Sequence, residues 1–472
     1  MTMRSDVVIV GAGPTGLLLA GDLAAAGVSV TLLERRPEHE NNLTRAFAVH
    51  ARTMEVLDAR GLADELAGRG TRVDELQFLR RVRIGLGDLP SRYPFLVVTP
   101  QYEVERLLEQ RAAKHAARIL RGVEVQDVRQ DGEGVDVLTD GELHRARYVV
   151  GTDGVRSTVR RAVGLPFPGR TVARSMMLAD VRLAQRPPDV VTADADGRAF
   201  GFVAPFGDGW YRVIAWRRDR QLPDDAPVDL NDVRQAFMQA LGTDYGMHDP
   251  RWLSRFHSDE RQVPRYRVGR VFLAGDAAHV HSPAGGQGMN TGLQDAANLG
   301  WKLAADLQGW ARPGLLDSFH DERHPVGESA LRISGGMVRV VTSGPRRLAL
   351  ATRVAARVTR VRPVARRAAL TVSGIGIRYA RPRGAHPMVG RRVGDVELAG
   401  GTRLYETLRD GAFVLVGHAA GISASEHVRV VRPSGDLAGT TTMLVRPDGY
   451  VAWAGDRPTA RQVREAVAAW CG

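Results

Sequence analysis

Short apolar runs followed by glycine predict alternating strands and helices at the start of the chain. Residues 7–10 are all valine or isoleucine, as in a parallel strand that is buried on both faces. The helix expected from Pro14 to about Ala26 stops at Gly27, a residue that favours helix ends. Residues 28–33 form the next apolar run. The pattern therefore predicts a strand–helix–strand unit.

The pattern changes after this unit. Helices are expected at about 50–60 and from Pro100 onward, and short strands separated by glycines follow over 119–150. Residues 172–268 are again rich in strands, with one helix expected at about 229–241. We interpret this segment as a mixed-sheet substrate domain that is inserted into the first domain.

The last third of the chain is expected to be mostly helical before a small terminal unit. A long helix is expected from the glycine-rich segment near Gly288 to about Asp306, and an arginine-rich helical stretch covers 314–380. The expected division has the first domain with its helical extension at 1–171 and 269–385, the substrate domain at 172–268, and a compact αβ domain at 386–472.

A glycine-rich motif joins the first strand to the first helix. Its sequence, Gly11-Ala12-Gly13-Pro14-Thr15-Gly16, has Glu34 at the end of the next strand, 18 residues beyond Gly16. This context is typical of dinucleotide binding, because Gly11 allows a tight turn, Gly13 lets a pyrophosphate approach, and Gly16 lets helix and sheet pack closely. The carboxylate would accept the ribose hydroxyls. The cofactor-binding residues predicted from this unit are Gly11, Gly13, Thr15, Gly16, Glu34 and Arg35.

A second motif, 260 residues later, suggests that the dinucleotide is FAD rather than NAD. An apolar run at 271–274 leads into Gly275-Asp276, and a glycine-rich helix start follows. A simple NAD-dependent dehydrogenase would not need this motif. Asp276 would hold the ribityl chain, and the positive end of the helix near Gly288 would face the flavin ring; the alternative is that Asp276 only caps this helix. The residues predicted to surround the flavin are Asp276, Pro283, Gly288, Met289 and Asn290.

A third feature is Asp153-Gly154, which follows a strand at 148–151. An aspartate at a strand end could anchor the diphosphate region of the cofactor and a tight turn. Asp-Gly is also a common turn pair, so its position between the two stronger motifs is what makes Asp153 a candidate.

Together these motifs resemble the class A flavoprotein aromatic hydroxylases, which have the para-hydroxybenzoate hydroxylase fold. The resemblance also includes Thr44-Arg45-Ala46, the HARTME sequence at 50–55, and residues 445–453, and it covers the whole chain. It is greatest to hydroxylases that tailor polyketides and antibiotics. It implies an α/β fold with a Rossmann-like FAD-binding domain, an inserted mixed-sheet substrate domain and a thioredoxin-like C-terminal domain, here without redox cysteines.

The resemblance also implies the reaction. NADPH or NADH reduces FAD, and O2 then gives a C4a-hydroperoxyflavin that hydroxylates an aromatic, polyketide-like secondary metabolite. Carried over by position, Arg45 and Gln101 should contact the flavin or its diphosphate, although a surface salt bridge for Arg45 and helix capping for Gln101 are the alternatives.

Most candidate substrate-binding residues come from the inserted domain, while the catalytic base stays unknown. The apolar and stacking surface predicted to face the substrate consists of Phe202, Phe206, Trp216 and Pro283, although many of the aromatic residues here could belong to the core. His279 and His281 lie beside the second motif, and we expect both to be structural. No residue spacing indicates a metal site.

Composition excludes several other functions. The net charge is +12 and the pI is near 10.5, but the basic residues are nearly all arginine and aromatic residues are only 6%, so nucleic-acid binding is not expected. No apolar run approaches the ~20 residues of a membrane helix. The single cysteine, Cys471, and the absence of a recognisable signal peptide suggest the cytoplasm. The arginine-rich stretch at 339–367 could form an amphipathic membrane helix, but Gly344-Pro345 and Arg362-Pro363 break its apolar series. It is therefore expected to pack against the FAD-binding domain or a second subunit, which would give a homodimer.

Several alternatives remain at this point. Baeyer–Villiger oxygen insertion or rifampicin-type antibiotic inactivation would keep the cofactor and change the chemistry. A flavin-dependent reductase resembling the geranylgeranyl reductases is a further rival, which the C-terminal domain argues against. A non-catalytic flavoprotein that binds a biosynthetic intermediate belongs to a different functional class.

Overall fold

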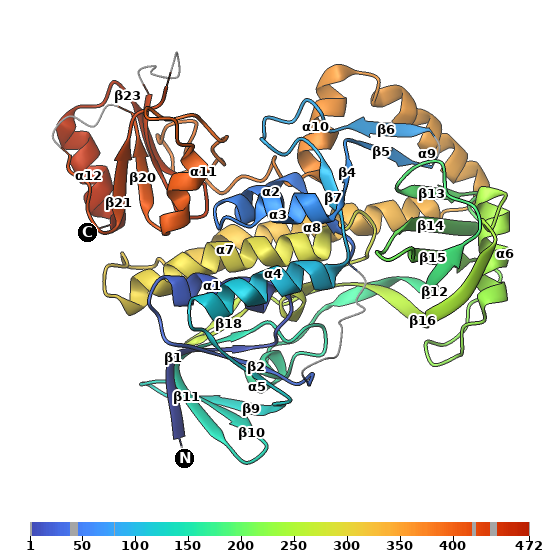
Figure 1. Cartoon of the computed structure of the whole chain (residues 1–472), viewed down its shortest axis with the longest axis horizontal. Coiled ribbons are helices and arrows are strands. Elements are labelled where there is room, and N and C mark those ends of the chain that lie inside the picture. The colour runs from blue at the N-terminus through green and yellow to red at the C-terminus, as the bar shows by residue number, and fades with distance from the viewer. Residues whose placement is uncertain (1, 38–45, 80, 418–421, 435–440, 472) are drawn as a thin grey trace.

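A sheet of eight strands lies in the lower part of the view in Figure 1, below helices α1, α4 and α7. The computed structural model describes residues 2–37, 46–79, 81–417, 422–434 and 441–471. β1 lies between β2 and β11 and pairs with both in parallel, and its residues 7–9 are fully buried. The strands are β1 (Thr2–Val10), β2 (Val30–Glu34), β8 (Arg118–Arg121), β9 (Val125–Gln130), β10 (Val135–Thr139), β11 (Leu143–Gly151), β17 (Arg267–Val268) and β18 (Val271–Leu273).

The predicted strand–helix–strand unit is present. α1 begins at Pro14, where proline is well tolerated, and it ends just before Gly27, which adopts a φ of +78°. α1 packs against α4 and α7, and Figure 1 shows the three helices side by side over the sheet. The helices around the first part of this sheet are α1 (Pro14–Ala25), α2 (Ala51–Asp58), α3 (Ala63–Arg69), α4 (Gln101–Lys114) and α5 (Thr158–Ala162).

A second, six-stranded sheet stands beside the first. Its centre is the long antiparallel pair β12 and β16, and α6 packs on β14 and β15 and ends at Gly242, which has a φ of +80°. β19 joins this sheet from the second cofactor motif, so the motif is anchored to both sheets. The elements are β12 (Gly169–Leu183), β13 (Thr192–Ala195), β14 (Ala199–Pro205), β15 (Tyr211–Arg217), α6 (Leu230–Leu241), β16 (Met247–Gln262) and β19 (His279–Val280).

Short strands between α2 and α4, and four long helices, complete the central part. α9 and α10 pack on β6. β6 belongs to the segment expected to bind FAD, and Leu348 of α9 is buried, whereas the apolar row Leu350, Val354, Val358 and Val361 is exposed in the single chain. The elements are β3 (Ala48–Val49), β4 (Thr71–Val73), β5 (Glu75–Phe78), β6 (Val82–Gly85), β7 (Leu96–Val98), α7 (Gln287–Leu307), α8 (Ser318–Val341), α9 (Pro345–Val358) and α10 (Arg362–Val372).

The C-terminal unit has its own four-stranded mixed sheet in the order β21-β20-β22-β23. It is attached through buried polar contacts: Arg52 of α2 donates to the Tyr405 hydroxyl at 3.0 Å and also to the carbonyl of Asp448. Its likeness to thioredoxin stays a prediction. The elements are α11 (Leu404–Thr407), β20 (Phe413–Val416), β21 (Val428–Val431), β22 (Thr441–Val445), β23 (Val451–Asp456) and α12 (Ala460–Cys471).

Buried charges also connect this unit to α7 and α8. Glu322 accepts hydrogen bonds from Lys302 at 2.8 Å and from Arg446 at 2.6 and 2.9 Å. Burial raises the pKa of Glu322, but the two cations outweigh burial and hold the pKa well below its usual value. The carboxylate is therefore ionised at neutral pH and holds three segments together. Among the described helices, none is long and apolar enough to cross a membrane.

Candidate functional site

The glycine-rich loop between β1 and α1 is shaped by close backbone contacts. A Cβ on Gly11 would lie 2.6 Å from the carbonyl oxygen of Thr152, and a Cβ on Gly16 would lie 2.1 Å from that of Gly11. Gly13 differs, because no atom lies within 4 Å of the position of its missing Cβ. No described side chain caps α1, so its first N–H groups are available to an anion.

Glu34 reaches back to this loop. The backbone N–H of Ala12 donates to its Oε2 at 2.6 Å, and the backbone and Nε of Arg36 donate to its Oε1 at 2.9 and 3.2 Å. Burial raises the pKa of Glu34, but these hydrogen bonds and the Arg36 charge hold the pKa below its usual value. Arg36 was not predicted from the sequence, whereas its predicted neighbour Arg35 is exposed.

Gln101 is connected to the same region. It is the first residue of α4, and its Nε2 donates to Glu105 Oε1 at 2.8 Å, so its side chain does not cap the helix. Glu105 in turn lies 3.7 Å from Arg36 as an ion pair. A continuous polar network therefore joins Gln101 to Glu34. Arg45 lies outside the described residues.

A fully buried carboxylate holds the second motif in place. Asp295 of α7 accepts hydrogen bonds from the Gly275 backbone N–H at 3.1 Å, from His279 Nε2 at 2.7 Å and from Arg323 Nε at 2.7 Å. Burial raises the pKa of Asp295, yet Arg323 and His279 hold it below its ordinary value. These contacts place His279 within the fold as a buried partner of Asp295. The Nδ1 atom of His281 is hydrogen-bonded to the carbonyl oxygen of Ser282 at 3.0 Å.

The two cofactor motifs meet directly. Thr15 Oγ1 lies 2.8 Å from the position of a Cβ on Gly275 and 2.3 Å from that on Gly292, so only glycine fits at both positions. Asp276 is exposed, forms no hydrogen bond with a described residue, and has its Oδ1 3.8 Å from the Cβ position of Gly288. Its carboxylate is thus available at the start of α7 instead of capping that helix.

Asn290 joins the start of α7 to the segment before α2. Its Oδ1 accepts from the His50 backbone N–H at 2.8 Å, and its Nδ2 donates to the carbonyls of Ala48 at 2.9 Å and Gly286 at 2.8 Å. Met289 beside it is buried. Gly286, the N-cap of α7, has a φ of +61°, and no side chain in the described part of the structure caps the helix. The hydrogen bonds of Asn290 therefore fix the position of the first turn of α7, while its backbone N–H groups stay available to a ligand.

Asp153 is engaged in its own turn. Its carboxylate accepts from the Ser157 hydroxyl at 2.5 Å and from the Thr158 backbone N–H at 2.7 Å, which stabilises the start of α5. The Asp153 Cα is 2.9 Å from the position of a Cβ on Gly11. Asp153 therefore shapes the wall against which the glycine-rich loop rests.

These features fit FAD as one extended ligand. An uncapped helix start with a gap at Gly13 suits a pyrophosphate, and the exposed carboxylate of Asp276 beside a second uncapped helix suits a ribityl chain and ring. The contact through Thr15 joins the two halves into one site.

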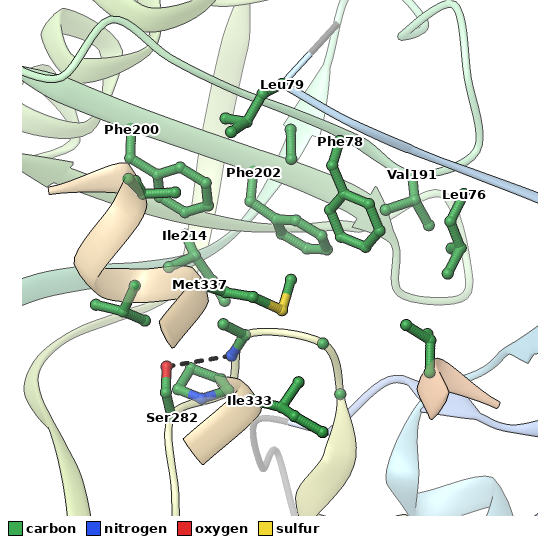
Figure 2. Close-up of a pocket in the computed structure, with 18 of the residues that line it drawn as sticks. Leu76, Phe78, Leu79, Val191, Phe200, Phe202, Ile214, Ser282, Ile333 and Met337 are labelled. Carbon is green, nitrogen blue, oxygen red and sulfur yellow. Dashed lines mark hydrogen bonds between the residues drawn. The ribbon is translucent and has the colours of Figure 1, made fainter. Parts of the chain in front are cut away.

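A cavity of about 580 Å³ adjoins the second motif, between the six-stranded sheet and α8 (Figure 2). Its walls are almost entirely apolar. Figure 2 shows Phe78, Phe200 and Phe202 on one side and Met337 and Ile333 on the other, near the loop that begins at Ser282. Such a concave apolar chamber is typical of small-molecule sites.

Three of the four predicted substrate-binding residues line this cavity: Phe202, Trp216 and Pro283. Phe206 does not line it; its ring is fully buried under the Arg212 guanidinium at 3.6 Å. The lining residues from β5, β6 and α8 were not predicted, because those segments carry no motif and only the tertiary fold brings them together.

His50 lines the cavity as a buried imidazole, and burial lowers its pKa to about 4. Between pH 6.5 and 4 the unfolded state binds a proton that the folded state does not, so the free energy of unfolding should fall as the pH falls through this window, by up to about 3 kcal/mol. In urea unfolding at several pH values, the free energy of unfolding should depend less steeply on pH for His50→Gln than for the unmodified protein. An equal pH dependence of the free energy of unfolding in both proteins would contradict a buried, neutral His50.

Two family models match the chain. One, described as FAD binding domain, matches residues 4–334, and another, described as aromatic-ring hydroxylase, C-terminal, matches residues 386–472. The chain belongs to the flavoprotein aromatic hydroxylases. This confirms the class A resemblance, the α/β fold with an FAD-binding domain, and FAD as the cofactor of a monooxygenase.

Relatives of this hydroxylase span its whole length. Rifampicin monooxygenase of Streptomyces venezuelae is 39% identical, over 99% of this chain and 98% of that protein. Dialkyldecalin synthase of Streptomyces rugosporus is 36% identical, over 100% of this chain and 99% of that protein. The solved structure of the anhydrotetracycline hydroxylase from Streptomyces rimosus superposes with a TM-score of 0.87 and 37% identity, covering 100% of this chain and 99% of that one.

Proposed function

We propose that this hydroxylase inserts one oxygen atom from O2 into a large aromatic secondary metabolite of polyketide type, with NADPH or NADH as reductant. The observation that carries the proposal is the apolar cavity of about 580 Å³ whose wall includes the loop leading into α7. Relatives named for rifampicin and anhydrotetracycline support a polycyclic substrate.

The residues that we propose to hold FAD lie along the two joined motifs. When bound, the flavin takes electrons from the nicotinamide and activates O2 for transfer to the substrate. The proposed set is Gly11, Gly13, Thr15, Gly16, Glu34, Arg35, Arg45, Gln101, Asp153, Asp276, Pro283, Gly288, Met289 and Asn290.

The cavity walls would orient the substrate and exclude water. Phe202 and Pro283 offer apolar surface against an aromatic ring. Trp216 also lines this cavity, and its buried Nε1 has no hydrogen-bond partner among the described residues, so a carbonyl or hydroxyl oxygen of the substrate would satisfy this donor. An apolar chamber also protects activated oxygen from loss to water.

We further propose the three-part division at 1–171 with 269–385, 172–268, and 386–472. The need for NAD(P)H and the single Cys471 favour the cytoplasm. A homodimer that covers the exposed apolar row Leu350, Val354, Val358 and Val361 is part of the same proposal, and light scattering tests it.

The test uses the purified holoenzyme and a panel of polycyclic phenols. A substrate should accelerate NAD(P)H oxidation, and the product should contain one oxygen atom from 18O2, with NMR separating ring hydroxylation from Baeyer–Villiger insertion. Protein that retains no FAD, or a product whose new oxygen comes from water, would refute the proposal.

A second candidate follows from the similarity to dialkyldecalin synthase. The same apolar cavity would hold a flexible apolar chain and favour its closure into a decalin ring system without net oxidation. A product of unchanged mass, formed without O2 consumption, would favour this candidate.

A further inference from the structure

The cavity has one charged wall residue with no counter-charge. Among the described residues that line it, none is Asp or Glu, and the only titratable ones are His50 and Arg332. Burial holds the His50 imidazole neutral at physiological pH. Arg332 is therefore the only described lining residue that carries a formal charge.

Arg332 lies on the face of α8 that forms the cavity wall. Ile333, Gly336 and Met337 line the cavity with it, at spacings that place side chains on one side of a helix. Its side chain is also exposed, so it lies where the cavity opens to solvent. The Met337 sulfur is 3.6 Å from the Cβ position of Gly285, which places the same helix face against the loop before α7.

No described residue pairs with this guanidinium. Glu328 precedes it by four residues on α8, a spacing that allows an ion pair, yet the structure contains no ion pair or hydrogen bond between them. Other arginines near the cavity are engaged: Arg339 contacts Glu260, and Arg218 donates to the carbonyl of Thr342. A free guanidinium beside an apolar chamber is a ready partner for an anionic oxygen.

We propose that Arg332 binds an anionic oxygen of the substrate, so that the enzyme selects aromatic molecules that carry a carboxylate or an ionised phenol. This inference rests on the proposed function for the role of the cavity. It adds a specificity residue to that function: the apolar ring system fills the chamber, and the negative group remains at its mouth.

The test compares two fluorescent probes that share one aromatic scaffold, 8-anilinonaphthalene-1-sulfonate and uncharged N-phenyl-1-naphthylamine. In titrations of the holoenzyme, Arg332→Gln should weaken binding of the sulfonate about tenfold and change binding of the neutral probe less than about twofold. The loss of sulfonate affinity caused by Arg332→Gln should become smaller as salt is raised from about 0.05 to about 0.5 M, because salt screens a charge pair at the solvent-exposed mouth of the cavity.

Two control variants locate the effect. Arg346→Gln removes an exposed arginine of α9 that does not line the cavity, and it should leave both affinities unchanged. Ala193→Phe adds bulk to the cavity wall and should weaken both probes. Three results would each overturn the proposal. The first is an equal loss of sulfonate affinity in Arg332→Gln and Arg346→Gln, and the second is an equal loss of affinity for both probes in Arg332→Gln. The third is sulfonate affinity that Ala193→Phe leaves unchanged.

Probe binding requires no turnover, so this inference and the proposed function fail separately. An enzyme that shows the charge preference but never transfers oxygen would refute only the proposed reaction. An active hydroxylase whose Arg332→Gln variant binds the sulfonate normally would refute only the role of Arg332.

Discussion

Gly13→Ala should lower FAD affinity at least about tenfold, equivalent to about 1.4 kcal/mol, while leaving the apoprotein folded. The backbone of Gly13 is extended, with φ −76° and ψ 177°, and its missing Cβ points into space free of protein atoms within 4 Å. The methyl group therefore meets nothing until a pyrophosphate occupies the gap. Thermal unfolding of the apoprotein and titration with FAD measure the two effects separately.

The control is Gly68→Ala, which adds a methyl group in helix α3 at a position with equally free space. It should keep FAD affinity unchanged. Normal FAD binding by Gly13→Ala would show that the pyrophosphate does not approach this residue. Gly16→Ala is a poorer test, because its Cβ would clash with the Gly11 carbonyl and disturb the fold itself.

Glu322→Gln should destabilise the folded protein by about 3–5 kcal/mol. The substitution keeps the shape of the side chain but leaves Lys302, which is fully buried, and Arg446, which is 4% exposed, without the carboxylate that both contact. Arg446 keeps its ion pair with Asp448, but Lys302 has no other ion-pair partner among the described residues, and a desolvated cation that loses its partner carries a large energetic cost. Chemical denaturation, followed by circular dichroism, measures the loss.

A matched surface substitution provides the comparison. Glu465→Gln removes an ion pair with Arg461 in which both side chains are largely exposed, and it should change stability by less than about 1 kcal/mol. Equal effects of the two substitutions would mean that the Glu322 cluster is solvated in solution.

Local sequence patterns predicted the parts of the fold that depend on neighbouring residues. The first strand, α1 and its end at Gly27 follow from an apolar run, a proline and a glycine close together in sequence. β4, β5 and β6 were not assigned, because their exposed and buried positions do not alternate strongly. The arginine-rich helices were expected, but the local sequence did not decide whether the FAD-binding domain or a second subunit covers their apolar row.

In the candidate site, too, features that depend on neighbouring residues were predicted, and features that depend on the tertiary fold were not. The glycine-rich loop was predictable because Gly11, Gly13 and Gly16 act within one turn and one helix start. The hydrogen bonds of Asn290 to His50 and Ala48 span more than 200 residues, and nothing in the local sequence indicates them. Asp295 and Arg36 were missed for the same reason: their roles depend on partners that only the tertiary fold supplies.

The buried contacts of the C-terminal unit bear on how such enzymes can be recombined. Arg52 and Glu322 lie far from this unit in sequence, yet they reach the Asp448 carbonyl and the Arg446 side chain. A chimaera that exchanges residues 386–472 with those of a relative would separate these partners unless α2 and α8 came from the same parent. Crossover points for shuffling should therefore be chosen so that the residues of this charge network come from one parent, and a single crossover in the linker before residue 386 should be avoided.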